Sequence, residues 1–223
     1  MLTYAFDLMY AIYEEEGYAP AEIPSLILSK NLYGIEIDPR AGALAAFALT
    51  MKARAKQRTF FNKKVEPNVC VLDPIRFTPD EIDLLLTRGG DKHAEAAFWN
   101  QFEHADMFGS LIQPDSELTL RLKQHIAQLD DGGDILQADV LNWAERVIEQ
   151  AEYLAPSYAV LVANPPYMGS GYMAQLLAQF AERQFSTSKY DLFAMFVARS
   201  FSFVRPRGYA ALVTMEAWMT GAI

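Results

Sequence analysis

The sequence predicts an α/β fold built on an open, mostly parallel sheet. Apolar segments typical of buried strands cover residues 32–37 and 158–163, with further strand signals at 134–138 and 209–214. Helical signals lie between them, and strands that alternate with helices are typical of parallel sheets. Such sheets bind ligands at the carboxyl ends of their strands. Functional residues are therefore expected directly after the predicted strands.

The first helix is expected at residues 2–16, where apolar side chains recur at three- and four-residue steps and Gly17 provides a stop signal. Asp38-Pro39 predicts the start of a long helix that continues to about residue 58, with aspartate as N-cap and proline at the first helical position. Further helices are expected at 24–30 and 191–203, and a turn at 205–208.

An acidic, helical insertion is expected within this single domain of residues 1–223. Residues 66–139 hold 15 acidic and 5 basic side chains, a net charge of −10, whereas the rest of the chain has a net charge of +1. Turn sequences rich in proline, glycine and aspartate separate three helical pieces, near 79–87, 91–106 and 115–129. We therefore predict an insertion at residues 66–134.

Composition narrows the class of protein. Apolar residues make up 52% of the chain and charged residues 21%, which is typical of a soluble globular protein. No apolar run reaches the roughly 18 residues of a membrane span, and the N-terminus lacks a signal-peptide pattern. The single cysteine, Cys70, excludes an internal disulfide and supplies no metal-ligand cluster. These features predict a cytoplasmic protein with no membrane and no metal partner.

A basic stretch leaves two interpretations open. Six cationic side chains occur with no acidic residue among them: Lys52, Arg54, Lys56, Arg58, Lys63 and Lys64. They can face the phosphates of a nucleic acid, or they can simply solvate the end of a helix, which is the commoner case. The net charge of −9 for the whole chain neither supports nor excludes DNA as a partner.

The sequence Asn164-Pro165-Pro166-Tyr167 directly follows the strand expected at 158–163. An exocyclic adenine amine is a poor nucleophile because its lone pair is delocalised into the ring. The side-chain oxygen of Asn164 and the carbonyl of Pro165 can accept its two N–H bonds and hold the nitrogen in an attacking geometry, while the prolines fix the backbone. The Tyr167 ring can stack on a base swung out of its duplex. The alternative is a rigid turn without a function.

Two acidic residues are candidates for binding a nucleotide-like cofactor. Glu36 lies at the tip of the first predicted strand, where a carboxylate commonly accepts hydrogen bonds from ribose hydroxyls. Asp38 faces the same way but already serves as a helix N-cap. Asp139 ends a weaker predicted strand, where it can accept from the amine of a cofactor adenine while Val140 packs on the ring. Either carboxylate can instead be only a strand-end charge or cap.

In this order along the chain, the three sites resemble the adenine-N6 DNA methyltransferases of the gamma arrangement, in which cofactor-binding segments precede Asn-Pro-Pro-Tyr. The resemblance is closest to the large methylases of single-chain (type IIG) restriction–modification systems and of BREX phage-defence systems, the PglX-like proteins. It covers nearly the whole chain and includes the segments 31–39, 108–112, 190–193 and 208–214.

The resemblance implies a Rossmann-like methyltransferase fold and S-adenosylmethionine as the cofactor. Glu36, with the adjacent Ile37, would bind the cofactor ribose, and Asp139 with Val140 would bind its adenine. The methyl group would pass directly to the target nitrogen, with no metal and no covalent enzyme intermediate.

The resemblance also implies site-specific methylation of adenine in DNA, in a restriction–modification or phage-defence system. Asn164 and Pro165 would hold the target amine, Pro166 would help to fix the loop, and Tyr167 would stack on the target base. DNA and subunits of a defence system are the implied partners.

An incomplete domain is expected on the same grounds. The family carries a glycine-rich cofactor loop on its first strand, and the helix that follows this loop corresponds here to residues 2–16. The first strand, the closing strands and the DNA target-recognition domain are therefore expected to be missing, and the fragment alone is expected to bind cofactor poorly and to be inactive.

Two other functions stay open at this stage. Methyltransferases that act on an RNA base or a protein glutamine also use Asn-Pro-Pro-Tyr. A non-catalytic interaction module is the second alternative, with the acidic insertion docking a partner subunit or mimicking the charge of a nucleic acid.

Overall fold

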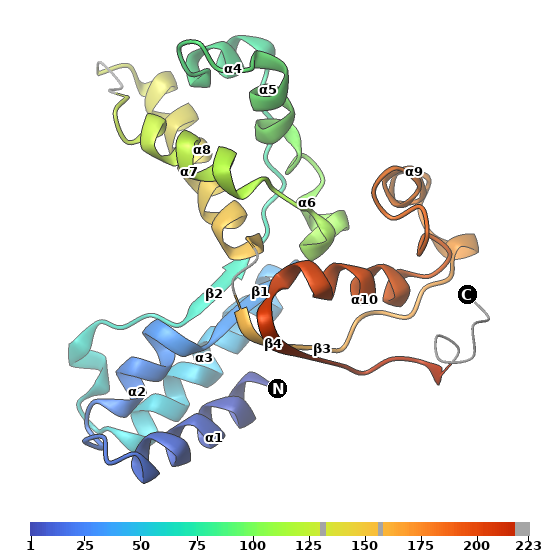
Figure 1. Cartoon of the computed structure of the whole chain (residues 1–223). Coiled ribbons are helices and arrows are strands. Elements are labelled where there is room, and N and C mark those ends of the chain that lie inside the picture. The colour runs from blue at the N-terminus through green and yellow to red at the C-terminus, as the bar shows by residue number, and fades with distance from the viewer. Residues whose placement is uncertain (130–132, 156–157, 217–223) are drawn as a thin grey trace. The chain divides into compact units, whose positions relative to one another are not determined.

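The computed structural model describes residues 1–129, 133–155 and 158–216, and its elements are shown in Figure 1. The chain divides into two units, the N-terminal unit Met1–Asp73 and the C-terminal unit Pro74–Ile223. Each unit has its own two-stranded parallel sheet, β1–β2 in the first and β3–β4 in the second. Mixed helices and strands with parallel pairing are thus confirmed. None of the described helices is long and apolar enough to cross a membrane.

The N-terminal unit comprises α1 (Leu2–Glu15), α2 (Ile23–Leu26), the π-helical turn η1 (Ile27–Asn31), β1 (Tyr33–Glu36), α3 (Pro39–Lys56), the 3-10 turn η2 (Phe60–Lys63) and β2 (Asn68–Val71). Strands β1 and β2 pair with Glu36 opposite Val71, and α3 connects them. The elements expected between residues 2 and 58 are confirmed. Residues 68–71, inside the segment expected as an insertion, form β2 and pair with β1 in this unit.

Local chemistry explains where α3 begins. The Asp38 side chain accepts a hydrogen bond from the backbone N–H of Arg40 at 2.8 Å, and Pro39 occupies the first helical position. This hydrogen bond also holds the pKa of the Asp38 carboxyl below its usual value. A Cβ at Gly42 would lie 2.5 Å from the Val71 side chain, so glycine lets α3 approach β2 closely. Helix α3 therefore starts beside the carboxyl end of β1.

The C-terminal unit begins with helices and ends with a sheet. Its elements are α4 (Pro79–Leu85), α5 (Lys92–Asn100), α6 (Ala105–Phe108), the 3-10 turn η3 (Gly109–Leu111), α7 (Ser116–Ile126), α8 (Ile135–Leu154), β3 (Tyr158–Ala163), the 3-10 turn η4 (Ser170–Tyr172), α9 (Gln175–Gln184), α10 (Leu192–Phe203) and β4 (Val204–Leu212). The three helical pieces expected in the acidic segment are confirmed, as are the strand at 158–163 and the helix at 191–203.

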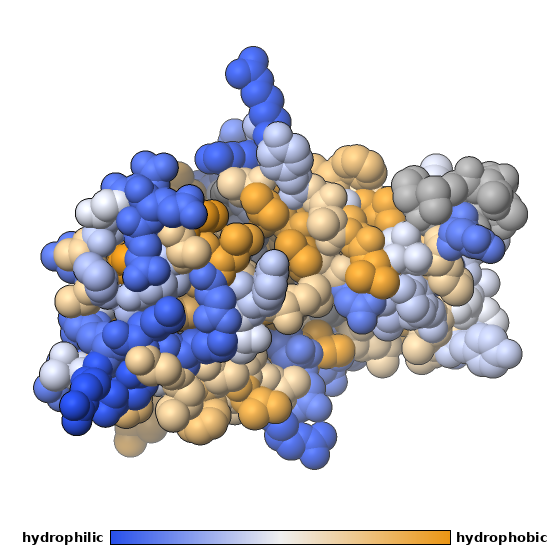
Figure 2. Space-filling view, turned by 90° about the horizontal axis from the view of Figure 1, so that it is seen from below, coloured by the Kyte–Doolittle hydropathy of each residue, from blue (hydrophilic) through white to orange (hydrophobic). Residues whose placement is uncertain are grey.

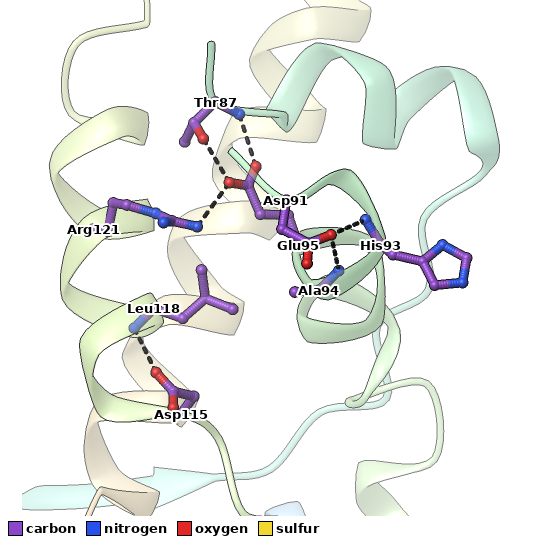
Figure 3. A network of polar contacts seen from close by, with 8 residues as sticks. All are labelled: Thr87, Asp91, His93, Ala94, Glu95, Asp115, Leu118 and Arg121. Carbon is purple, nitrogen blue, oxygen red and sulfur yellow. Dashed lines mark hydrogen bonds and ion pairs between the residues drawn. The ribbon is translucent and has the colours of Figure 1, made fainter. Parts of the chain in front are cut away.

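A buried carboxylate joins two of the acidic-segment helices, α5 and α7 (Figure 3). Glu95 of α5 is fully buried and accepts hydrogen bonds from the backbone N–H of Thr87 at 2.8 Å and from the Arg121 guanidinium of α7 at 2.9 Å. Because a buried charge is tolerated only when it is paired and hydrogen-bonded, this contact fixes how the two helices pack. Asp91 and Asp115 cap the starts of the same helices.

The strand expected at 134–138 is wrong, because α8 covers these residues. Asp134 caps the helix by accepting the Leu136 N–H at 2.9 Å. The apolar pair that suggested a strand, Ile135 and Leu136, is 78% and 76% exposed. Apolar residues recur instead at helical spacing and are buried along α8: Val140, Ala144, Val147, Ile148, Ala151 and Leu154.

The β3–β4 sheet contains the strand expected at residues 158–163, after which site residues were predicted. Strand β4 runs parallel to β3, with Val160 opposite Tyr209 and Ala163 opposite Leu212. The register shifts between Tyr158 and Val160, so the turn expected at 205–208 is an irregularity within β4. Arg207 has a φ of 66° there. Helix α10 is the connection that brings β4 back to β3.

Candidate functional site

The loop that carries Asn164-Pro165-Pro166-Tyr167 starts where β3 ends at Ala163, as predicted. The Ala163 carbonyl accepts a hydrogen bond from the Val213 N–H at 3.1 Å, which extends the pairing of the two strands to the base of the loop. Pro165 is buried, whereas Asn164 and Pro166 are exposed. The loop is therefore anchored by its first proline and presents Asn164 at the surface.

Two acceptors of this loop have no partner among the described residues. Neither the Asn164 side-chain amide nor the Pro165 carbonyl takes part in a hydrogen bond with another group in residues 1–129, 133–155 or 158–216. Hydrogen-bonding groups in ordered loops are usually paired within the protein or with water. Neither oxygen is therefore committed to a partner among the described residues.

Tyr167 is held at its hydroxyl and at its ring. The hydroxyl donates to the Val213 carbonyl at 3.0 Å, and the ring packs edge-on against the Phe193 ring of α10, with 6.1 Å between centroids. The side chain is still 48% exposed. An aromatic ring whose orientation is fixed and whose surface is half open can stack on a planar ligand.

Helix α10 holds the remainder of the loop. The Met168 carbonyl accepts the Leu192 N–H at 2.9 Å, and Gly169 forms an isolated antiparallel bridge with Asp191, which also caps α10. Residues 190–193 were expected only as part of the family resemblance and not as a support for this loop. Its contacts with the loop show that it supports the candidate site.

Glu36 lies at the carboxyl end of β1, as predicted, in the N-terminal unit. Its Oε1 atom accepts the backbone N–H groups of Ile37 at 2.8 Å and Asp38 at 3.2 Å. Its second carboxylate oxygen forms no hydrogen bond with the described residues. The carboxylate is therefore held in place by the backbone and keeps one oxygen for a hydroxyl donor, which fits a ribose. Ile37 is 44% exposed beside it.

The chain matches the protein family described as the Eco57I restriction-modification methylases over residues 30–223. It belongs to this methylase family. Two curated relatives are similar over 98% of the chain: the adenine-specific methyltransferase BrxX of Escherichia coli O9:H4 (strain HS), at 37% identity, and the adenine-specific methyltransferase PglX of Lacticaseibacillus casei (strain Zhang), at 33%. The chain spans about a fifth of the length of these two relatives.

Family membership confirms the resemblance that the sequence motifs indicated. The BrxX relative is 37% identical over 245 aligned positions, and the PglX relative is 33% identical over 229. The roles of the individual site residues are not tested by these matches and stay predictions.

The structure does not support the reason for which Asp139 and Val140 were predicted as site residues, namely a position at the end of a strand. Asp139 and Val140 lie in the second turn of α8 and not at a strand end. Val140 is buried, so its side chain packs within the helices of the C-terminal unit. Their assignment to a cofactor adenine now rests on the resemblance alone.

The basic stretch belongs to the last turns of α3 and the residues after it. Several of its cations already have partners: Lys52 pairs with Asp7, Lys56 lies 4.1 Å from the centre of the Tyr10 ring, and Lys63 donates to the Ala21 carbonyl. Helix α3 starts beside the end of β1 and runs back along the sheet, so this basic end lies away from Glu36 within the N-terminal unit. These contacts support the interpretation as a solvated helix end.

Proposed function

We propose that this chain is part of the catalytic domain of an S-adenosylmethionine-dependent methyltransferase that modifies adenine N6 in DNA, in a phage-defence or restriction–modification system. The observation that carries the proposal is the loop after β3, where the Asn164 side chain and the Pro165 carbonyl have no partner among the described residues. Membership of the Eco57I methylase family and the printed names of BrxX and PglX support the substrate. The fold would then be a Rossmann-like methyltransferase fold.

The loop can activate an amine without acting as a base. The Asn164 oxygen and the Pro165 carbonyl accept the two N–H bonds of the target amine, which draws the nitrogen out of conjugation and directs its lone pair toward the methyl donor. Acceptors that are oriented before the reaction stabilise the developing positive charge without reorganisation. Pro166 limits the loop backbone, and the Tyr167 ring supports the face of the base.

Glu36 is the proposed ribose ligand for the cofactor. Two backbone N–H groups hold one carboxylate oxygen, and the other oxygen can accept from a hydroxyl. Ile37 offers apolar surface next to it. S-adenosylmethionine, when bound, would supply an electrophilic methyl group on a sulfonium and would be left as a neutral thioether, and the methylated amine would release one N–H proton to water. An enzyme of this kind would act on DNA in the cytoplasm, and its other partners would be subunits of the defence system.

The test is methyl transfer by the full-length native protein. With a tritiated methyl donor and DNA, RNA and protein as separate substrates, we expect label in DNA only. Asn164→Ala should lower the rate of transfer at least about 100-fold, because it removes one preorganised hydrogen-bond partner of the reacting group. Glu216→Ala, an exposed carboxylate in the same unit, is the control and should leave the rate unchanged.

Each result decides between the alternatives. Label in RNA or protein but not in DNA would replace the substrate while keeping the loop chemistry. Full DNA methylation by the Asn164→Ala protein would overturn the assignment of this loop as the catalytic site. A protein that methylates none of the three would be a non-catalytic interaction module.

A further inference from the structure

Three exposed tyrosines lie in the Asn164–Tyr167 loop or in the segments that contact it. Tyr172, in the 3-10 turn that follows the loop, is 87% exposed, the largest fraction among the large apolar side chains that the structure describes. Tyr190, just before α10, is 57% exposed, and Tyr167 itself is 48% exposed. The face drawn in Figure 2 carries both hydrophilic and hydrophobic residues, and an isolated exposed apolar residue is ordinary on a protein surface. These three rings are not isolated in this sense, because all three lie in or next to one candidate site.

The backbone beneath Tyr172 is fixed at several points. The Tyr172 N–H donates to the Gly169 carbonyl at 2.9 Å, and the Ser170 N–H donates to the Tyr190 carbonyl at 2.8 Å. On either side of this turn, Met168 and Met173 pack against a buried apolar cluster that includes Leu192 and Met195 of α10. The Tyr172 ring therefore stands on an anchored turn, so binding through it costs little backbone entropy.

Tyr190 is tied to the same turn. Its carbonyl accepts from Ser170, and the neighbouring Asp191 bridges to Gly169. The ammonium group of Lys189 lies 5.4 Å from the centre of the Tyr190 ring. The hydrogen bond from Lys189 to Glu182, at 2.8 Å, raises the pKa of Lys189, so this group stays cationic at neutral pH. The turn that carries Tyr172 and the segment that carries Tyr190 are thus joined by backbone hydrogen bonds, and we call these two segments together the loop platform.

The segment that carries the two tyrosines is less acidic than residues 66–139. Residues 158–216 hold three acidic and five basic side chains, a net charge of +2, whereas residues 66–139 have a net charge of −10. One acidic side chain of 158–216, Asp191, is engaged as a helix cap, and one basic side chain, Arg199, is buried. A nucleic acid strand is therefore not repelled from the segment that carries the two tyrosines.

From these observations we infer that Tyr172 and Tyr190 contact the nucleotides that flank the target adenine. The inference rests on the proposed function. When the target base leaves the stack, the bases and sugars beside it lose their neighbours and expose apolar faces. Aromatic rings on a fixed turn can pack against these faces. Because every base has a π-face, such contacts add affinity for the opened DNA without reading its sequence.

The experiment uses the full-length native protein and a duplex oligonucleotide that carries its own methylation site, located by mapping N6-methyladenine in cells that express the protein. Tyr172→Ala and Tyr190→Ala should each raise the KM for this duplex about tenfold and change kcat less than threefold. Tyr172→Phe and Tyr172→Trp should stay near the wild-type KM, because they keep the ring. Tyr4→Ala, an exposed tyrosine on α1, is the matched control and should behave as wild type.

A fluorescent 2-aminopurine at the target position supplies a second readout, because its emission rises when the base is unstacked. Tyr172→Ala should lower this emission at saturating protein, and Tyr4→Ala should not. If Asn164→Ala abolishes methylation while Tyr172→Ala and Tyr190→Ala match Tyr4→Ala in both readouts, the inference is wrong and the proposed function stands. If Asn164→Ala leaves DNA methylation intact, the proposed function itself fails. A Tyr172→Ala protein that does not fold leaves the decision to Tyr190→Ala.

Discussion

Tyr167 has two features that substitution can separate, its ring and its hydroxyl. Tyr167→Phe removes the hydrogen bond to the Val213 carbonyl but keeps the ring against Phe193. We expect the free energy of unfolding to fall by about 1 kcal/mol and methyl transfer to remain within about tenfold of wild type. Tyr167→Ala also removes the ring, so transfer should fall further, by about 100-fold. Urea unfolding and methyl transfer by the full-length protein measure the two effects.

The two substitutions also test the role of the ring. Equal transfer rates for Tyr167→Phe and Tyr167→Ala would mean that the ring does not support the target base.

For single residues, the sequence predicted which side chains carry the chemistry of the site but not which contacts hold those side chains in place. Asn-Pro-Pro-Tyr after an apolar strand could be recognised from residue types alone. The contact of Tyr167 with Val213 could not, because it joins residues 46 positions apart.

Arg199 is the residue that holds α10 in place. It is 3% exposed, and its guanidinium donates to the carbonyls of Ser110 and Ile112 at 2.9 Å and of Leu154 at 2.8 Å. It also lies over the Phe203 ring, at 3.7 Å. One cation therefore ties α10 to the end of α8 and to the residues around η3. Since α10 supports the Asn164–Tyr167 loop, Arg199 stabilises the helix against which the candidate site packs.

Replacing Arg199 should therefore destabilise the C-terminal unit. Arg199→Met leaves two buried carbonyls and one partly buried carbonyl without a donor, at about 1–3 kcal/mol for each buried group. We expect a loss of at least about 3 kcal/mol in the free energy of unfolding, measured by urea titration. Arg199→Lys keeps the charge but lacks the planar fork, so it should recover only part of the loss. Arg205→Met, at an exposed site, should change stability by less than about 0.5 kcal/mol. A similar small change for Arg199→Met would show that these hydrogen bonds do not hold α10.

The pH dependence of this effect follows from the pKa. Burial lowers the pKa of Arg199 to about 10, so the side chain is charged in the folded and unfolded states at neutral pH. Below pH 9 both states bind the same proton, and the stability difference between wild type and Arg199→Met should be constant from pH 6 to 9. Above pH 10 the folded state releases the proton first, so the wild type should gain stability relative to the variant. A difference that changed between pH 6 and 9 would point to another titrating group.

Helix and strand prediction succeeded where a local signal decided the structure. Asp38-Pro39 fixed the start of α3, and the apolar run at 158–163 formed β3. It failed at 134–138, where the pair Ile135-Leu136 suggested a strand but the burial of α8 follows a helical period. It also missed β2, a four-residue strand whose identity depends on pairing with β1. Such pairing is set by tertiary contacts, which local patterns do not contain.

At the scale of the molecule, the candidate residues fall into two units with separate proposed tasks. Glu36 belongs to the N-terminal unit, and the Asn164–Tyr167 loop belongs to the C-terminal unit. Both residues were expected in one domain of residues 1–223, so their position in separate units was not predicted. The proposal therefore makes a distinct prediction for each unit when binding and transfer are measured separately.

In the full-length native protein, Glu36→Ala should raise the Kd for S-adenosylmethionine at least about tenfold, since a charge-assisted hydrogen bond to the ribose is lost. Asn164→Ala should leave this Kd within about twofold of wild type, although it stops methyl transfer. Glu22→Ala, an exposed carboxylate in the same unit as Glu36, is the control for the loss of charge. Calorimetry measures the Kd, and tritium incorporation measures the transfer. If Glu36→Ala bound the cofactor as tightly as Glu22→Ala, the carboxylate at the end of β1 would be a structural group that only caps its own backbone.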